Sequence, residues 1–381
     1  MKVLLINETC GIGSHGRICK EIADTYKADG HKVVIAFGRN GKIAQDCEKY
    51  AFRIGNDVDV YIHALYTRIL DRHGFGSKNA TKRFIKWAEN YNPDVIWLHN
   101  IHGYYINIEL LFGWIKHHPE KEIRWTLHDC WAFTGHCGHF LVSDCKKWKK
   151  GCYECPEKHQ YPKSLFLDNS QQNYKRKRVL FGNIEKMNLI TPSEWLRDQV
   201  KQSFLQEYPI EVMRNKIDTK TFKFTESDLR DKLDIRNKYV ILGVASKWTC
   251  RKGVNDFFKL ATLLDHRFKI IMVGLTQSQM KRSPKEIIGI QHTEDAKQLA
   301  QFYSMADVFI NLTYEENYPT VNLEAEACGT PVITYDTGGC KETLMRKESK
   351  VVETGKLSEI IRLLENKYSE NNEIRRGTTL E

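Results

Sequence analysis

Short apolar runs typical of buried β-strands alternate with helix-like stretches along most of this 381-residue chain. The strand-like runs lie at residues 2–7, 31–37, 94–98, 123–127 and 187–190, and then at 240–245, 269–273, 308–312 and 332–335. Repeated strand–helix–strand units predict parallel sheets covered by helices on both faces. The chain is therefore expected to be an α/β protein with two Rossmann-like, doubly wound domains, and its length also favours two domains.

The two domains are expected to join near residues 192–215. We predict an N-terminal domain over residues 1–192, a C-terminal domain over 193–360, and a helix with a loose polar tail over 361–381. Residues from about 130 to 178 interrupt the alternation of strands and helices. Within them, residues 144–178 hold ten Lys and Arg against four Asp and Glu. We interpret this stretch as an irregular, Cys-rich insertion in the N-terminal domain.

Composition excludes several protein classes. Apolar residues make up 41% and charged residues 28%, which is close to a globular average and unlike a disordered chain, a collagen or a coiled coil. The apolar runs are far shorter than the ~20 residues of a membrane span, and no signal peptide is expected. Eleven cysteines, an odd and mostly scattered set, predict a reducing, cytoplasmic compartment. The net charge of +10 predicts an anionic partner: nucleic acid, a membrane surface or a phosphorylated substrate.

A glycine-rich loop, GIGSHG at residues 11–16, follows the first strand and opens a helix. Such a loop brings backbone N–H groups to an anionic ligand, which makes Gly13 and Ser14 candidate binding residues. A dinucleotide fold also needs an acid at the end of the second strand, and Arg39 stands there instead. Three interpretations stay open: a packing turn, a phosphate-binding loop and an NADP site.

Two glutamates eight residues apart mark the C-terminal half. Glu316 follows a strand, and Glu324 lies on the first turns of the next helix, where the N–H groups of Thr320 and Val321 can receive a phosphate. The carboxyl ends of strands in an open sheet face the ligand crevice. Two carboxylates beside a phosphate suit the binding of hydroxyl groups, for example of sugars. The alternative is one acid at a helix start and one exposed helical acid.

The stretch at residues 313–339 resembles the E-x7-E signature of retaining glycosyltransferases of the GT-B fold, family 4. This resemblance implies two Rossmann-like domains that face a cleft. It also implies that Glu316 faces the donor sugar, that Glu324 holds the nucleotide ribose, and that the N–H groups of Thr320 and Val321 receive the diphosphate.

The loop KWTCRKG at residues 247–253 resembles the basic loop of the same family. Lys252 then neutralises the departing diphosphate. The arginine that the family usually carries upstream is replaced by Ser246, so Lys247 or Arg251 is expected to supply the second cation. A solvated turn is the alternative.

In the N-terminal half, Thr126-Leu127-His128-Asp129 resembles the family position at which a histidine faces the donor sugar. This implies a catalytic role for His128. The stretch with His99 and His102 resembles the acceptor side of bacterial polysaccharide members. Each histidine could instead be a satisfied core residue.

Five cysteines cluster between residues 130 and 155. Cys137, Cys145, Cys152 and Cys155 offer four thiolates, and the final C-x-x-C is a common zinc half-site. A structural zinc is predicted, and reduced thiols or disulfides are the alternatives. No cofactor is expected to be needed for catalysis. The cluster resembles a subgroup that assembles bacterial capsule, colanic acid or lipopolysaccharide.

Together these patterns predict an enzyme: a retaining, metal-independent glycosyltransferase that uses a nucleotide-diphosphate sugar, with UDP favoured over GDP. The resemblance implies a polyprenyl-diphosphate-linked saccharide as acceptor, no nucleic-acid partner, and peripheral contact with anionic lipid at the inner face of the cell membrane. The alternatives are a basic nucleic-acid-binding protein, favoured by residues 144–178, and an NADP-dependent oxidoreductase.

Overall fold

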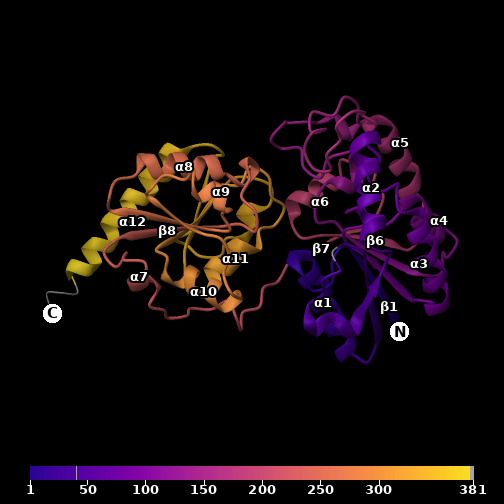
Figure 1. Cartoon of the computed structure of the whole chain (residues 1–381), viewed down its shortest axis with the longest axis horizontal. Helices are drawn as coiled ribbons and strands as arrows, with labels where there is room; N and C mark the ends of the chain where they lie inside the picture. The colour runs from indigo at the N-terminus through magenta and orange to yellow at the C-terminus, as the bar shows by residue number, and fades with distance from the viewer. Residues whose placement is uncertain (40, 378–381) are drawn as a thin grey trace. The chain divides into compact units, whose positions relative to one another are not determined.

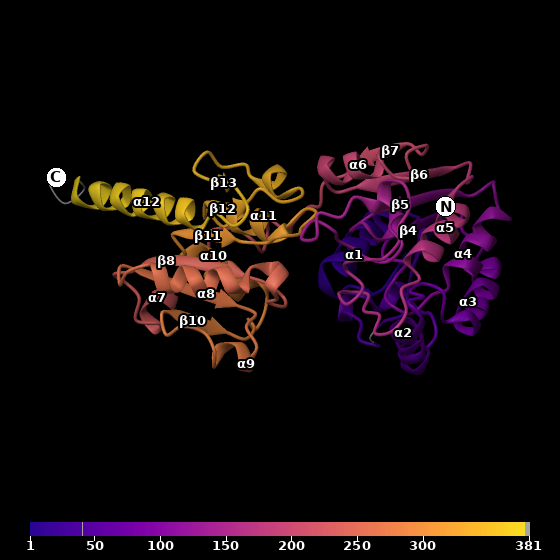
Figure 2. The same cartoon turned by 90° about the horizontal axis from the view of Figure 1, so that it is seen from above.

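The computed structural model describes residues 1–39 and 41–377, with side chains up to residue 370. It divides the chain into two compact units, unit 1 (Met1–Asn215) and unit 2 (Lys216–Glu381). Each unit is built on its own parallel sheet, with helices on both faces (Figures 1 and 2). The α/β, doubly wound architecture predicted from the sequence is confirmed.

Unit 1 has a seven-stranded sheet in the order β3-β2-β1-β4-β5-β6-β7. Its strands are β1 (Lys2–Asn7), β2 (Lys32–Phe37), β3 (Ala51–Arg53), β4 (Val95–Leu98), β5 (Glu122–Thr126), β6 (Met187–Thr191) and β7 (Ile210–Val212). Its helices are α1 (Gly13–Ala28), α2 (Asp57–Leu70), α3 (Lys78–Tyr91), α4 (Ile108–Lys116), α5 (Ser170–Phe181) and α6 (Glu194–Val200), with 3-10 turns η1 (Gln45–Tyr50), η2 (Trp131–Phe133) and η3 (Lys147–Lys149).

Unit 2 has a six-stranded sheet in the order β10-β9-β8-β11-β12-β13. Its strands are β8 (Tyr239–Val244), β9 (Phe268–Val273), β10 (Ile287–Ile290), β11 (Val308–Asn311), β12 (Val332–Tyr335) and β13 (Lys350–Val352). Its helices are α7 (Leu229–Lys232), α8 (Val254–Leu263), α9 (Gln277–Met280), α10 (Ala296–Met305), α11 (Thr320–Ala327) and α12 (Leu357–Gly377), with 3-10 turns η4 (Cys250–Lys252) and η5 (Cys340–Thr343).

Both cores have two layers, because successive side chains of a strand point to opposite faces. In β8, Ile241 packs with α8 and α12, whereas Val240 and Leu242 pack with α10 and α11. In β1, the neighbouring side chains of Val3 and Leu4 likewise pack into two different core clusters, one on each face of the sheet. Near-continuous apolar strands are therefore the pattern that this fold requires.

The boundary between the units lies between Asn215 and Lys216, at the end of the expected join at residues 192–215 and later than the predicted domain limit of 192. The reason is that α6 packs against β6, and β7 pairs with β6 as the last strand of the first sheet. Within the predicted C-terminal helix and tail, α12 continues to Gly377, so the described residues of this segment are helical to that point. Residues 378–381 lie outside the described residues.

The predicted insertion at about 130–178 stays a prediction. Between β5 and α5 the described chain forms only turns, bends and the short η2 and η3. Residues 170–178, however, belong to α5, the helix that links β5 to β6, so this end of the stretch is part of the sheet architecture.

Lys177 fastens the irregular stretch to α5. Its side chain is buried, and its Nζ donates to the carbonyl oxygens of Trp131 at 2.7 Å and Thr134 at 3.1 Å. The same ammonium lies 3.3 Å from the centre of the Trp131 ring. Burial lowers the pKa of Lys177 to about 7.

We expect Lys177→Met to change how stability depends on pH. The pKa of Lys177 is lower in the folded chain than in the unfolded chain, so the unfolded chain binds more protons between about pH 7 and 10. As the pH rises through this range, the free energy of unfolding of the wild type therefore increases by up to about 1.4 kcal/mol per pH unit because of Lys177. The variant lacks this increase. Urea unfolding at several pH values measures the difference, with the exposed Lys175→Met on the same helix as control. Parallel pH profiles for wild type and Lys177→Met would contradict the expectation.

Candidate functional site

The switch point of the unit 2 sheet lies between β8 and β11, because the strand order runs from β8 to β10 in one direction and from β11 to β13 in the other. Ligands of open α/β sheets bind outside the carboxyl ends of the strands at such a point. The two loops that leave β8 and β11 there are residues 245–253 and 312–319. They carry the predicted Lys247, Arg251, Lys252 and Glu316.

Gly253 fixes the position of the basic loop. Its φ of +75° is in the left-handed region, and a Cβ added there would lie 2.2 Å from the carbonyl oxygen of Leu312. Only glycine therefore lets the loop approach β11 this closely. Thr249 caps η4 by accepting the Lys252 N–H at 3.3 Å, which holds the last turn before the helix.

Lys252 and Glu316 form an ion pair between the two loops. Both side chains are partly exposed, at 26% and 21%, so they remain accessible to a ligand. Arg251 fastens the loops together: its carbonyl accepts the Tyr314 N–H at 2.8 Å, and its guanidinium donates to the carbonyl of Glu315 at 3.3 Å. The structure thus brings Lys252, Arg251 and Glu316 together, while Lys247 is exposed on the same loop.

Helix α11 begins at Thr320, directly after the second loop, with Pro319 as its N-cap. Thr320 and Val321 are half-buried in its first turn, where the helix dipole favours an anion. Glu324 lies one turn further on and is buried at 4% exposure. Its carboxylate accepts the hydroxyl of Tyr303, on α10, at 3.0 Å.

Glu326, on the same helix, accepts hydrogen bonds from the segment at residues 345–349. It accepts the N–H groups of Met345 at 2.7 Å and Arg346 at 3.2 Å, and the hydroxyl of Ser349 at 2.7 Å. Three bonds to one segment make Glu326 a structural acid. Glu324 and Glu326 can therefore be compared directly by substitution. Both are buried on α11, but they accept hydrogen bonds from different neighbours.

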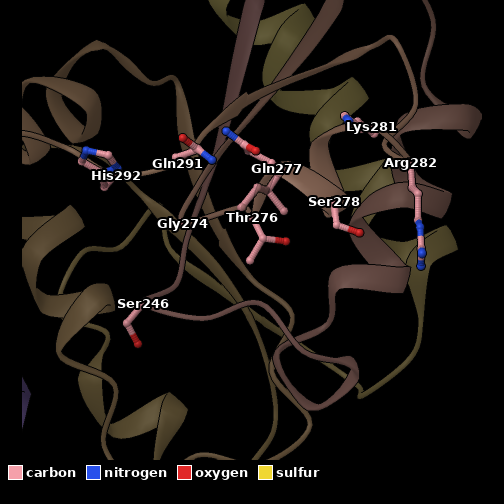
Figure 3. Close-up of a pocket in the computed structure, with 10 residues that line it drawn as sticks. Ser246, Gly274, Thr276, Gln277, Ser278, Lys281, Arg282, Gln291 and His292 are labelled. Carbon is pink, nitrogen blue, oxygen red and sulfur yellow. The ribbon is translucent and has the colours of Figure 1, made fainter.

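A pocket of about 890 Å³ lies at the carboxyl ends of β8, β9 and β10 (Figure 3). It is lined by Ser246, Gly274, Leu275, Thr276, Gln277, Ser278, Lys281, Arg282, Gln291 and His292. The bond from Gln279 Nε2 to the carbonyl of Trp248, at 3.0 Å, connects its α9 wall to the basic loop. Apart from Ser246, these residues were not predicted from the sequence, because they come from separate loops that only the fold brings together. The glycine at position 274 is the sequence signal that could have indicated this pocket. A Cβ there would lie 1.7 Å from the carbonyl oxygen of Ala245, so only glycine fits.

In unit 1 the switch point lies between β1 and β4. The glycine loop follows β1, and its Gly16 has no room for a side chain, since a Cβ would lie 2.8 Å from Thr9 Oγ1. Close packing therefore explains part of the glycine pattern. Gly13, at φ +71°, is exposed at the start of α1 and Ser14 is half-buried beside it.

His99 and His128 meet at the carboxyl ends of β4 and β5. His99 Nδ1 lies 3.1 Å from His128 Nε2, and the ring of His15 lies 4.3 Å from that of His128. Burial lowers the pKa of His99 to about 3 and holds the pKa of His128 well below its usual range. Both rings are therefore neutral at pH 7, and one donates to the other.

His102 forms a second pair, with Asp129, at 3.1 Å between Nε2 and Oδ2. Burial alone would raise the pKa of Asp129, but the contact with His102 holds it below its usual range. The rings of His73, Trp131 and Tyr161 surround His102, the nearest at 5.1 Å between centroids. Sequence reasoning missed this aromatic cluster, because its members are scattered over the chain.

The predicted zinc ligands are not gathered into one set. Among the described side chains, no three His, Cys, Asp or Glu are placed to hold a metal ion. The thiols of Cys137 and Cys155 are hydrogen-bonded to each other, and Cys152 accepts the Gly135 N–H at 3.1 Å. All four, Cys145 included, are free cysteines, so none of them forms a disulfide in this arrangement. The structural zinc stays a prediction.

Comparison with known proteins agrees with this geometry. Residues 225–379, almost all of unit 2, match the family of group 1 glycosyl transferases. The chain is 25% identical over 342 residues to the putative colanic acid biosynthesis glycosyl transferase WcaC of Escherichia coli, a match that covers 87% of this chain and 81% of the relative. It is 29% identical over 116 residues to an N,N'-diacetylbacillosaminyl-diphospho-undecaprenol alpha-1,3-N-acetylgalactosaminyltransferase of Campylobacter jejuni, a match that covers 29% of this chain and 30% of that relative.

Among solved structures, the HepE protein of Anabaena in complex with UDP is similar over 97% of this chain and 91% of its own, with a TM-score of 0.64 and 15% identity. This likeness confirms the GT-B fold expected from the sequence. The relatives support neither the oxidoreductase nor the nucleic-acid interpretation. Within the described part of the chain, no helix is both long and apolar enough to cross a membrane.

Proposed function

We propose that this chain is a group 1 glycosyltransferase and that it moves a sugar, with retention of configuration, from a nucleotide-diphosphate sugar to a saccharide acceptor in bacterial surface polysaccharide assembly. The observation that carries the proposal is the set of Lys252, Glu316 and the first turn of α11 at the switch point of unit 2. A cation, a partly exposed carboxylate and a helix N-terminus at one edge of a sheet suit a diphosphate joined to a sugar.

The donor is proposed to bind as follows. The diphosphate lies against Lys252 and the N–H groups of Thr320 and Val321, since both helix dipole and ammonium favour negative charge. Glu316 accepts sugar hydroxyls, and Glu324 accepts a ribose hydroxyl. The pocket of Figure 3 is large enough for the nucleoside base and offers side-chain amides and hydroxyls to it.

In the proposed reaction the bond between the anomeric carbon and the diphosphate oxygen breaks. The acceptor oxygen bonds to that carbon on the same face, and the acceptor proton moves to the departing phosphate. Lys252 stabilises the negative charge that develops on the diphosphate, with Lys247 or Arg251 as the second cation. No metal ion is required for this step.

Uridine is the proposed base, and the similar HepE structure holds UDP. The acceptor is proposed to be a lipid-linked saccharide held by unit 1. The name of the Campylobacter jejuni relative contains an undecaprenol-diphosphate saccharide, which supports this choice. His99 and His102 are proposed to bind the acceptor. Neutral His128 is proposed to contact the donor sugar. Donor binding by Gly13 and Ser14 stays a prediction. Peripheral contact with the inner face of the cell membrane follows from such an acceptor.

A thermal-shift panel of sugar nucleotides tests the proposal. We expect one or a few UDP-sugars to raise the melting temperature, because a ligand of the folded state stabilises it by mass action. The panel is repeated with a chelator: a lower melting temperature supports the predicted structural zinc, and retained donor binding supports metal-independent donor recognition. Anomeric analysis of the product by NMR then tests retention. If no sugar nucleotide shifts the transition, the proposed donor site is wrong.

A further inference from the structure

Helix α2 of unit 1 exposes an apolar stripe. Val58, Tyr61, Ile62, Leu65 and Ile69 are between 41% and 80% exposed. Their spacing places them on one face of the helix, while His63 and Thr67 are buried on the opposite face. Figure 2 shows α2 at the outer edge of unit 1. A soluble monomer seldom leaves such a continuous apolar face uncovered.

A second apolar segment continues the stripe. Leu165, Phe166 and Leu167 are 46%, 68% and 48% exposed. The Leu165 N–H donates to the carbonyl of Arg68 at 2.8 Å, and Asn169 Nδ2 donates to the carbonyl of Leu70 at 2.7 Å. These bonds hold residues 165–169 against the last turn of α2, so the two apolar segments are contiguous.

Basic side chains border this apolar area. Arg68 and Lys163 are exposed beside it, and Lys158 Nζ donates to the carbonyl of Phe166 at 3.4 Å. The backbone bond from Leu165 to the carbonyl of Arg68 places this exposed basic residue next to the apolar segment in the fold. The negative charges at the start of α2 are neutralised by ion pairs. Asp57 pairs with Arg53, and the carboxylate of Asp59 lies 3.6 Å from the guanidinium of Arg83.

A basic groove of about 560 Å³ lies between η3 and α5 in the same unit. Six cationic side chains line it, with Tyr153 and Tyr174 in its wall. They are Lys146, Lys147, Lys149, Lys150, Lys175 and Arg178. This concentration of positive charge suits phosphate groups.

We propose that these features form one membrane-docking surface for an anionic phospholipid bilayer. The apolar side chains of α2 and residues 165–167 insert at the boundary between headgroups and acyl chains, and the lysines and arginines contact lipid phosphates. The cationic border favours lipid over a second copy of the chain, whose identical surface would repel it. The inference deepens the proposed membrane contact and rests on that part of the proposed function. It uses none of the residues assigned to the donor.

Vesicle cosedimentation tests the surface, with full-length protein and vesicles of phosphatidylcholine alone or with about 30% phosphatidylglycerol. We expect the wild type to bind the anionic vesicles. The apolar variant Ile62→Ser/Leu65→Ser/Phe166→Ser should bind them about tenfold more weakly or worse. The cation variant Lys149→Gln/Lys150→Gln/Lys175→Gln should lose about a hundredfold at low salt and less at high salt.

Matched controls lie in unit 2. Leu263→Ser/Met345→Ser removes exposed apolar side chains, and Lys220→Gln/Lys259→Gln/Lys347→Gln removes three exposed cations. Both controls should bind vesicles like the wild type. Equal losses in test and control variants would overturn the assignment, and so would wild-type binding by both test variants. A dimer that only the apolar variant dissociates, with vesicle binding unchanged, would instead make the stripe a self-association surface.

The thermal shift by a UDP-sugar is measured on the same variants and separates the two proposals. Donor binding without vesicle binding refutes the docking surface alone. Vesicle binding without any donor shift refutes the donor site and leaves the surface standing.

Discussion

Replacing Lys252 with methionine is expected to lower kcat/KM for sugar transfer by about a hundred- to a thousandfold. Lys252 faces Glu316 from a loop that Gly253 holds against β11, so its ammonium is held in place before the donor binds. Removing a preorganised group that stabilises charge in the transition state costs about 2.7–4 kcal/mol, which corresponds to this change in rate.

Steady-state kinetics with the donor found in the thermal-shift panel measure the effect. Lys259→Met is the control, because Lys259 is exposed on α8 and is absent from the loops at the switch point. The account requires a fall in kcat. A rise in KM with unchanged kcat would assign Lys252 to uniform binding, and unchanged kinetics would remove it from the site.

Glu324→Gln is expected to weaken UDP binding by about ten- to a hundredfold, while Glu326→Gln leaves the affinity unchanged. Loss of a charged hydrogen-bond acceptor costs about 1.5–3 kcal/mol, and only Glu324 is assigned to the ligand. Glu326 is committed to Met345, Arg346 and Ser349, so its substitution should lower the melting temperature instead.

Calorimetric titration and thermal unfolding of both variants provide the two readings. Tyr303→Phe is a further control, since it removes the hydroxyl that Glu324 accepts without removing the carboxylate. Equal loss of affinity in Glu324→Gln and Glu326→Gln would show that the effect comes from the fold of α11. Unchanged affinity in both would reject the role of Glu324.

The central strands could be predicted because each is a nearly continuous apolar run, as in β1 and β8. The edge strands β3, β7, β10 and β13 were not predicted: β3, β7 and β13 have only three residues each, and Gly289 interrupts the four residues of β10. The domain boundary depended on one of them. Nothing local to residues 193–215 indicates that β7 joins the first sheet, since this pairing is a long-range contact.

In the candidate site, too, local motifs could be found in the sequence and long-range contacts could not. Lys252, Glu316 and Glu324 could be chosen as candidates from the sequence, because each belongs to a local motif whose spacing reflects a loop or a helix turn, and their roles stay predictions. The pocket near Thr276 and the ring cluster around His102 could not, because the fold assembles them from distant segments. The metal prediction depended on spacing alone, and spacing does not determine which thiols meet: among the described residues, Cys137 contacts Cys155 but not a complete ligand set.

The central claim is that unit 2 binds a nucleotide-diphosphate sugar, and titration calorimetry of the wild-type protein with UDP tests it most directly. NADPH and a short oligonucleotide serve as comparison ligands at moderate salt. The account predicts saturable binding of UDP at one site per chain and no saturable binding of either comparison ligand. Absence of binding by UDP and other nucleoside diphosphates, together with saturable binding of NADPH or the oligonucleotide, would contradict it.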